Sequence, residues 1–154
     1  MKIWGWILGG VLVFGIGLFV WQIVRPMPDM GTAGHSMEPP DTGSISAGDP
    51  IVEVVLPKDL SGNATIGKQI FEAKCAACHG LNAVGQNGIA PPLVHKIYEP
   101  NHHSDGAFQA AVSNGVRSHH WRFGDMPKID GLTRADVKMI ASYVRELQRE
   151  NGIN

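Results

Sequence analysis

The amino-acid sequence predicts an all-α protein, in which a small helical domain follows an N-terminal apolar helix. No stretch of the 154 residues alternates apolar and polar side chains for long, which is the pattern of a half-buried strand. Apolar residues instead recur at helical spacing between residues 137 and 147. The first 25 residues contain an apolar run long enough to form a hydrophobic helix of its own.

The apolar run Ile3–Val24 contains 22 residues, and none of them is charged. As a helix it would extend roughly 33 Å, enough to cross a hydrocarbon layer of about 30 Å. Trp4, Trp6 and Trp21 stand near its two ends, where tryptophan anchors membrane helices at the interface. A cleaved signal peptide is the alternative, but the run is longer than such peptides have and lacks a small-residue cleavage site. We therefore expect residues 1–25 to be an uncleaved transmembrane anchor.

Residues 26–60 have the composition of a linker. They contain six prolines and, up to residue 56, five acidic residues without a lysine or arginine. A segment of this kind buries too little apolar surface to offset the entropy lost on ordering. We expect a flexible acidic linker, in which the apolar stretch Ile51–Leu56 either forms a short strand or docks on the domain.

Three methionines and one histidine fall close together in this linker: Met27, Met30, His35 and Met37. Thioether and imidazole groups are ligands that copper prefers, so a copper-binding segment is one interpretation. The plainer interpretation, which we favour, is a flexible linker that happens to contain methionine.

Residues 61–154 contain the signals of three helices that would build the domain. Asn63 or Thr65 can cap the first helix, which leads directly into a pair of cysteines. Ser104 is placed to begin the second helix, and Gly115 is placed to end it.

The last helix has the clearest pattern of the three. Thr133 and Asp136 form a capping-box start. Its apolar face consists of Val137, Ile140, Ala141, Val144 and Leu147. The basic residues expected on the opposite, exposed side are Arg134, Lys138, Arg145 and Arg149.

The pentapeptide Cys75-Ala76-Ala77-Cys78-His79 carries the most specific chemical signal in the sequence. Two thiols at this spacing can each add to one vinyl group of a haem, and the adjacent imidazole then reaches the iron. A redox-active cysteine pair and half of a zinc site are the alternatives. The chain has no third cysteine for a zinc site, and no βαβ pattern of the kind that accompanies thioredoxin-type pairs. The motif therefore predicts covalent attachment of one haem c.

Two loops can complete such a site. The glycine-rich loop Gly80–Pro92 ends in a proline-rich turn around Pro91, where a rigid backbone carbonyl can meet the second ring nitrogen of His79. The later loop ends in the dipeptide Met126-Pro127. A lone methionine is more often a packing residue than a ligand, so packing is the alternative role of Met126.

From about Ser61 to its end, 94 of the 154 residues, the chain resembles the class I monohaem cytochromes c. The features that carry the resemblance are the cysteine motif, the first helix with Gly67 and Phe71, the loop with Pro91, Met126-Pro127, and the terminal helix with Tyr143. The resemblance implies the class I cytochrome c fold, in which the first and last helices cross where Gly67 and Tyr143 meet.

The resemblance also implies the roles of the site residues. Cys75 and Cys78 would be the thioether attachments, His79 the proximal ligand of the iron and Met126 its distal ligand. Pro91 would belong to the loop that lines the haem on the His79 side.

Five further histidines stand in the domain: His95, His102, His103, His119 and His120. Three roles are open, namely hydrogen bonding to haem propionates by His120, Trp121 or Arg122, a surface copper or zinc site, and replacement of an axial ligand. Side chains of neighbours such as His119 and His120 usually diverge, so such a pair rarely supplies two ligands to one metal. We favour the propionate role, and count Trp121 as haem-binding, because a buried carboxylate needs donors.

The implied ligands leave no open position on the iron, so we expect single-electron transfer rather than enzymatic catalysis. Because related families attach haem outside the bacterial cytoplasm, the expected protein is an inner-membrane-tethered periplasmic carrier that exchanges electrons with respiratory membrane complexes. The alternatives are an electron-accepting subunit of a periplasmic dehydrogenase or copper oxidase, and a copper-handling or redox-sensing protein. A net charge of −1 and a pI near 6.6 argue against nucleic-acid binding.

Overall fold

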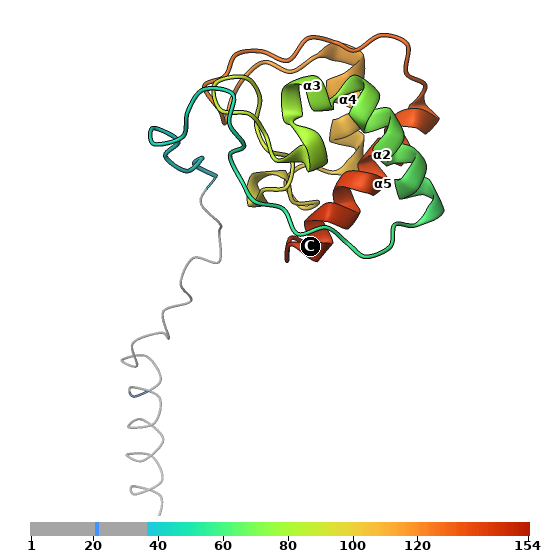
Figure 1. Cartoon of the computed structure of the whole chain (residues 1–154), viewed down its shortest axis with the longest axis horizontal. Helices are drawn as coiled ribbons and strands as arrows, with labels where there is room; N and C mark the ends of the chain where they lie inside the picture. Colours follow the sequence, from blue (N-terminus) through green and yellow to red (C-terminus); the bar gives the residue numbers. More distant parts are fainter. Residues whose placement is uncertain (1–20, 22–36) are drawn as a thin grey trace, which may run out of the picture. The chain divides into compact units, whose positions relative to one another are not determined.

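The computed structural model describes Trp21 and residues 37–154. Its helices are α2 (Gly62–Lys74), α3 (Ala76–His79), α4 (Asp105–Asn114) and α5 (Arg134–Glu150), with the short 3₁₀ turns η1 (Leu81–Ala83) and η2 (Lys96–Tyr98) (Figure 1). The described residues contain two isolated bridges and no strand. The all-α prediction is therefore confirmed for this part of the chain.

Helices α2 and α5 lie side by side in Figure 1, and their contact is closest at a glycine. A Cβ atom added to Gly67 would lie 1.9 Å from the carbonyl oxygen of Met139, so no larger residue fits between the two backbones. One turn further along α2, the rings of Phe71 and Tyr143 meet edge to face with centroids 5.7 Å apart. The predicted helix crossing is confirmed, and its contacts are with Met139 and Ile140 at the glycine and with Tyr143 beside it.

The observed helix caps agree only in part with the caps predicted from the sequence. Thr133 and Asp136 form the expected capping box at the start of α5, with the backbone N–H of each residue donating to the other's side chain. The cap of α2 is Ser61 rather than Asn63 or Thr65. The helix begins earlier than expected because the Ser61 hydroxyl accepts from the Ala64 N–H at 3.4 Å.

Arg145 is buried, and the prediction that it lies on the exposed side of α5 is wrong. Only 7% of its surface is accessible. Its guanidinium donates to a carboxylate oxygen of Asp105 at 2.9 Å, to the Tyr98 carbonyl at 2.7 Å and to the His103 carbonyl. A buried arginine is stable where its donors are matched in this way, and here they are matched by segments far away in sequence.

Gln148, one turn after Arg145, extends the same polar contact. It is fully buried, accepts from Arg145 at 2.6 Å, and donates to the carbonyl oxygens of Leu93 at 2.8 Å and Tyr98 at 3.0 Å. These side-chain bonds provide hydrogen-bond partners for backbone carbonyl groups of the irregular segment 93–103, which the segment does not supply itself. Helix α5 therefore fixes the course of that segment.

The expectation of a flexible linker up to residue 60 is wrong for residues 42–55. The Asn87 side chain donates to the carbonyl oxygens of Thr42 at 3.3 Å and Ile45 at 2.6 Å. The Asn151 side chain accepts from the Val55 N–H and donates to its carbonyl, both at 2.9 Å. Composition did not reveal this because the partners come from other segments. Within Ile51–Leu56, docking rather than strand formation is the outcome.

Among the described residues, no helix has the length and apolar character needed to cross a membrane. The expected anchor, residues 1–25, lies outside the described residues except for Trp21. The same holds for Met27, Met30 and His35 of the candidate copper segment, whereas Met37 is described. The chain divides into two compact units, residues 1–34 and 35–154, of which the second contains all the helices named above.

Substitution of Gly67 tests the helix crossing. We expect Gly67→Ala to lower the free energy of unfolding by about 1–3 kcal/mol, because the new methyl group meets backbone that cannot move aside. Gly62→Ala, in the first turn of the same helix, is the matched control, since nothing lies within 4 Å of a Cβ there. Chemical denaturation of the two haem-loaded variants measures the difference. Equal midpoints would show that the two helices are not in close contact.

Candidate haem site

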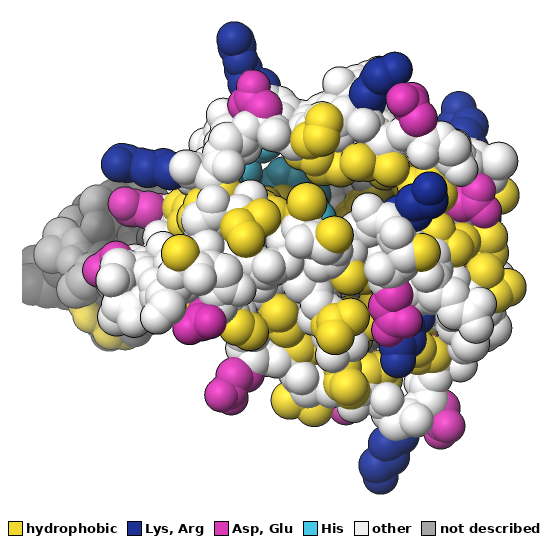
Figure 2. Space-filling model, turned by 45° about the horizontal axis from the view of Figure 1, so that its top comes forward, with side chains coloured by type: hydrophobic (Ala, Val, Ile, Leu, Met, Phe, Trp, Pro, Cys, Tyr) yellow, Lys and Arg dark blue, Asp and Glu magenta, His cyan; other side chains and the backbone are white. Residues whose placement is uncertain are grey.

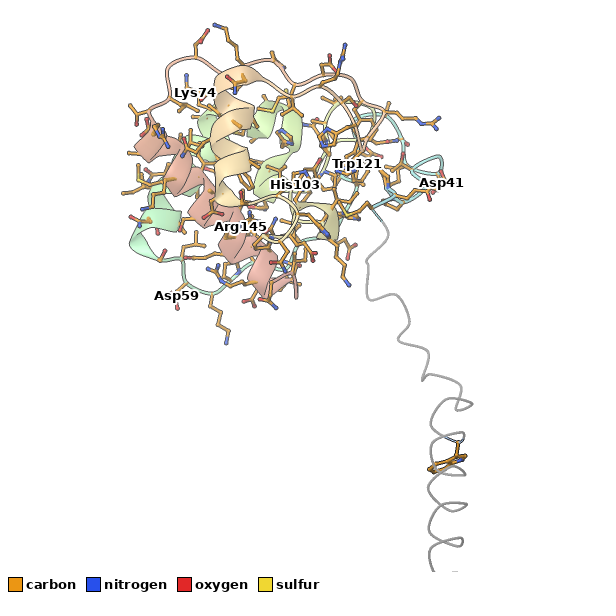
Figure 3. All side chains as sticks on the ribbon, turned by 180° about the vertical axis from the view of Figure 1, so that it is seen from behind. Asp41, Asp59, Lys74, His103, Trp121 and Arg145 are labelled. Carbon is orange, nitrogen blue, oxygen red and sulfur yellow. The ribbon has the colours of Figure 1, made fainter. Side chains whose placement is uncertain are left out.

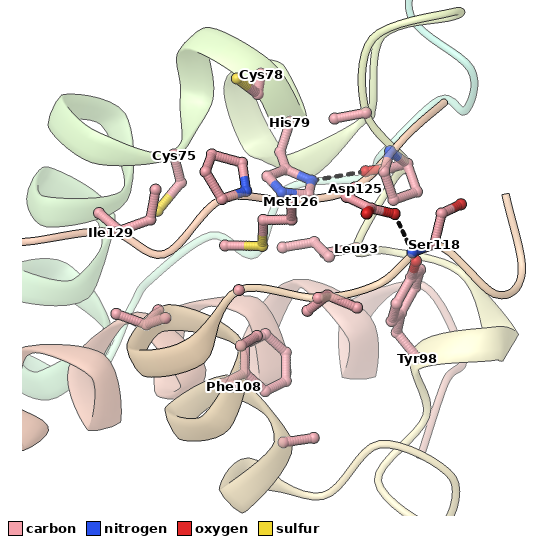
Figure 4. Close-up of a pocket in the computed structure, with 18 of the residues that line it drawn as sticks. Cys75, Cys78, His79, Leu93, Tyr98, Phe108, Ser118, Asp125, Met126 and Ile129 are labelled. Atoms are coloured by element: carbon pink, nitrogen blue, oxygen red, sulfur yellow. Dashed lines mark hydrogen bonds between the residues drawn. The ribbon is translucent and has the colours of Figure 1, made fainter. Parts of the chain in front are cut away.

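A cavity of about 470 Å³ lies between α3, α4 and the loop that joins α4 to α5 (Figure 4). Much of its wall is apolar, with Leu93, Phe108 and Ile129 among the contributors. Every residue that the sequence predicted for the site lines this one cavity: Cys75, Cys78, His79, Pro91, Trp121 and Met126. The structure therefore brings together side chains that are up to 51 positions apart in the chain.

The two cysteines occupy the start and the body of the single-turn helix α3. Cys75 ends α2 and caps α3, and its carbonyl accepts from the N–H groups of Cys78 at 3.1 Å and His79 at 2.9 Å. Burial, helped by the neighbouring Cys78, raises the pKa of the Cys75 thiol to about 11. A redox-active pair needs a thiol with a lowered pKa, so the protein environment does not favour that alternative.

His79 is oriented by the loop that follows it. Its Nδ1 lies 2.9 Å from the Pro91 carbonyl, which can only accept, so Nδ1 carries the proton and Nε2 keeps its lone pair. Burial lowers the pKa of His79, while the Pro91 bond acts in the opposite direction, and the ring is neutral as a metal ligand must be. The expected contact between His79 and a carbonyl near Pro91 is confirmed.

Gln86 is a site residue that the sequence analysis missed. Its Nε2 donates to the carbonyl oxygens of Ala76 at 3.3 Å, Ala77 at 2.9 Å and Cys78 at 3.1 Å. All three carbonyls belong to α3, and that of Ala76 also accepts from the Gly80 N–H at 3.0 Å, so the amide caps the helix that carries the cysteine motif. Nothing in a glycine-rich loop distinguishes this glutamine from any other polar residue.

Met126 is held in place through its backbone. Its N–H donates to the Val116 carbonyl and its carbonyl accepts from the Val116 N–H, both at 2.9 Å. Gly115, the predicted end of α4, has a φ of +76°, and a Cβ there would lie 2.6 Å from the Met126 carbonyl. Figure 4 shows the Met126 thioether and the His79 imidazole projecting into the same space.

Trp121 presents a buried polar atom that has no partner. The residue is 6% exposed, and its Nε1 makes no hydrogen bond with any described residue. Burial raises the pKa of the nearby Tyr98 phenol, and the Trp121 indole opposes that rise without reaching hydrogen-bond geometry. An unpaired buried N–H costs about 1–3 kcal/mol. A carboxylate of a group filling the cavity, such as a haem propionate, would remove that cost.

The cavity therefore fits a haem: two thiols and a neutral imidazole stand on one side, a thioether on another, and a buried donor at its edge. The sequence model of the family described as cytochrome c matches residues 64–148. The chain belongs to the cytochrome c family. As a class I cytochrome of this family, it carries one covalently bound haem c and acts as an electron carrier.

Individual cytochromes show how far the similarity extends. Cytochrome c6 of Cyanidioschyzon merolae is 38% identical over 81 residues, which are 51% of this chain and 68% of that protein. The cbb3-type cytochrome c oxidase subunit FixP of Bradyrhizobium sp. is 37% identical over 95 residues, 60% of this chain and 30% of the subunit. The subunit CcoP of Helicobacter pylori is 33% identical over 79 residues, 51% of this chain and 25% of the subunit. No solved structure matches the chain.

The other histidines that the structure describes separate into two groups. His103, His119 and His120 converge at the wall of the cavity, whereas His102 binds Glu99 with its Nδ1 2.9 Å from the carboxylate. His95 packs edge-on against the Trp121 ring at 5.6 Å. Of the residues proposed to bind propionates, Trp121 and His120 line the cavity, and the exposed Arg122 does not.

Replacement of Gln86 tests its role in holding the cysteine motif. Gln86→Glu has the same shape but places a carboxylate against three carbonyl oxygens at a helix C-terminus, so we expect a loss of about 1–3 kcal/mol of stability. The control is Gln69→Glu, an exposed position of α2, which should change stability little. Denaturation midpoints at constant haem content measure both. A Gln86→Glu variant as stable as Gln69→Glu would contradict the capping role.

Proposed function

We propose that Cys75 and Cys78 are the thioether attachments of the haem, that His79 is its proximal ligand and that Met126 is its distal ligand. The observation that carries the proposal is the orientation of His79, whose Nε2 lone pair is left free by the Nδ1 contact with Pro91. The antiparallel pairing of Met126 with Val116 supports the same assignment, because it fixes the backbone from which the thioether enters the cavity.

With both axial positions filled, the haem supplies one-electron oxidation and reduction without binding a substrate at the iron. The chain contributes a largely apolar wall that excludes water from the cavity, which favours a higher potential than a solvated site. Cys78 and Ile89, which line the cavity beside the cysteine motif, are exposed at the surface. That exposed part of the site is where we place the approach of a redox partner.

For its cellular role, we propose that the protein is a membrane-tethered, periplasmic electron carrier. Its redox partners would be membrane complexes of a respiratory chain. The uncharged run Ile3–Val24 supports the tether. A second candidate, a fixed subunit of an oxidase or dehydrogenase, is favoured by the relatives named as subunits of cbb3-type cytochrome c oxidase. This chain spans only 25–30% of those subunits, so their assembly is carried over as a proposal alone. Co-purification with a complex separates a subunit from a carrier.

Removal of the Met126 thioether tests the distal ligand. Met126→Ala should keep its covalent haem, bind carbon monoxide readily in the reduced state and have a lower potential, because the sixth position opens and a thioether ligand is lost. Met139→Ala is the control, since Met139 lies on α5 and does not line the cavity. Absorption spectra with and without carbon monoxide measure the effect. Ready binding of carbon monoxide by the unaltered protein would contradict ligation by Met126.

The anchor proposal is tested by fractionation. The full-length protein should stay with the membranes in high salt and be released by detergent, because an apolar helix of 22 residues partitions into the bilayer. A variant that lacks residues 3–24 and is exported through a separate cleavable signal is the control, and it should be released without detergent. A mature N-terminus at or beyond residue 26 would overturn the proposal.

A further inference from the structure

Three imidazoles from two separate loops meet at the wall of the cavity. His103 precedes α4, and His119 and His120 follow it. One ring nitrogen from each lies within 4.8 Å of those from the other two, and the ring centroids of His119 and His120 are 4.4 Å apart. The expectation that neighbours such as His119 and His120 diverge is therefore wrong here. The two imidazoles lie in a tight loop in which the Ser118 hydroxyl bonds the Trp121 carbonyl.

The hydrogen bonds of these rings determine which nitrogen carries the proton. Nδ1 of His103 lies 2.6 Å from the Ile97 carbonyl, and Nδ1 of His119 lies 2.9 Å from the Arg117 carbonyl. Because carbonyl oxygens only accept, both Nδ1 atoms are protonated and both Nε2 atoms hold a lone pair. Metal-binding histidines are commonly fixed in this way, with the second ring nitrogen donating to the backbone.

Arg145 supports the backbone from which His103 enters the cluster. Arg145 and His103 lie close together in Figure 3. The Arg145 guanidinium donates to the His103 carbonyl and is itself paired with the Asp105 carboxylate, which offsets its charge. Burial is the largest cause that lowers the pKa of His103, and its hydrogen bond to the Ile97 carbonyl acts in the opposite direction. Burial and the neighbouring histidines also lower the pKa of His120, against a backbone hydrogen bond with Met37.

A carboxylate is the wrong ligand for this cluster. The Nε2 lone pairs of His103 and His119 are acceptors, and a haem propionate would need donors in their place. The buried Nε1 of Trp121 already supplies a donor without a partner. A cation is the complementary ligand for clustered imidazole nitrogens that hold lone pairs, and first-row divalent transition metals are the cations that imidazole binds best.

We propose that His103, His119 and His120 bind one divalent transition-metal ion, Cu²⁺ or Zn²⁺, at a site separate from the haem iron. Three nitrogens around a tetrahedral ion at about 2.0 Å are roughly 3.3 Å apart, so small rotations of the side chains bring them together. His119 is exposed, which leaves the ion a path from solvent and a free position for water. Figure 2 shows histidine side chains in a hollow whose rim is largely hydrophobic. The proposal of this metal site does not rest on the identity of the redox partner.

Zinc titration of the haem-loaded, full-length protein in detergent tests the proposal, with a chromophoric chelator as competitor. We expect one Zn²⁺ per haem, and at least about tenfold weaker binding after His103→Ala, His119→Ala or His120→Ala. The matched control is His102→Ala, next to His103 but bound to Glu99, which should leave the affinity within about twofold. Each variant must keep the haem spectrum of the parent.

Two further measurements complete the test. Replacement of Met27, Met30 and Met37 by leucine should leave zinc binding unchanged, whereas a linker site would lose it. Cu²⁺ bound to the parent protein should show magnetic coupling to the nitrogens of three imidazoles, and to fewer in each alanine variant of the cluster. The proposal is overturned if the parent binds no zinc, or if the three cluster variants bind it as tightly as His102→Ala.

Discussion

The close crossing of α2 and α5 at Gly67 is the constraint on which the rest of the domain depends. Only a glycine lets the α2 backbone approach the Met139 carbonyl, where a Cβ would lie at 1.9 Å. Helix α2 leads at its C-terminus into Cys75, so the crossing fixes where the cysteine motif begins. Helix α5 carries Arg145 and Gln148 to the segment on the other side of the cavity. One contact thus sets the spacing between the two walls of the site.

Arg145 and Gln148 show how a helix can organise chain that has no regular structure. Residues 93–103 lack the repeating hydrogen bonds of a helix beyond the short turn η2, and their carbonyl groups at Leu93, Tyr98 and His103 bond to these two side chains. Buried polar groups are stable only when they are paired, so this segment can adopt few other paths. The position of His103, and through it the histidine cluster, follows from a residue of the last helix.

The residue patterns alone predicted features that are local in the chain, whereas the helix crossing and the distant site residues were predicted from the resemblance to cytochromes c. The cysteine motif, the capping box of Thr133 and Asp136, and the turn at Gly115 each rest on a few consecutive residues with a specific conformational or chemical preference. The burial of Arg145, the cap that Gln86 places on α3, and the bonds from Asn87 to Thr42 rest on partners distant in sequence. Helical periodicity and composition contain no information about such partners. The predictions of which residues lie on the exposed face of α5 and of how far the flexible linker extends were therefore wrong.

The loop between α4 and α5 combines two opposite kinds of ligand within three residues, 119 to 121. Its buried Trp121 offers a donor suited to an anion, while the lone pair of His119 suits a cation. The loop can hold both because its backbone is braced internally, by Ser118 with Asp125 at 2.8 Å and by the pairing of Met126 with Val116. A cation bound beside the cavity would add positive charge close to the haem, which disfavours the oxidised, more positive state of the iron. The same short segment therefore links metal occupancy to the ease with which this cytochrome releases its electron.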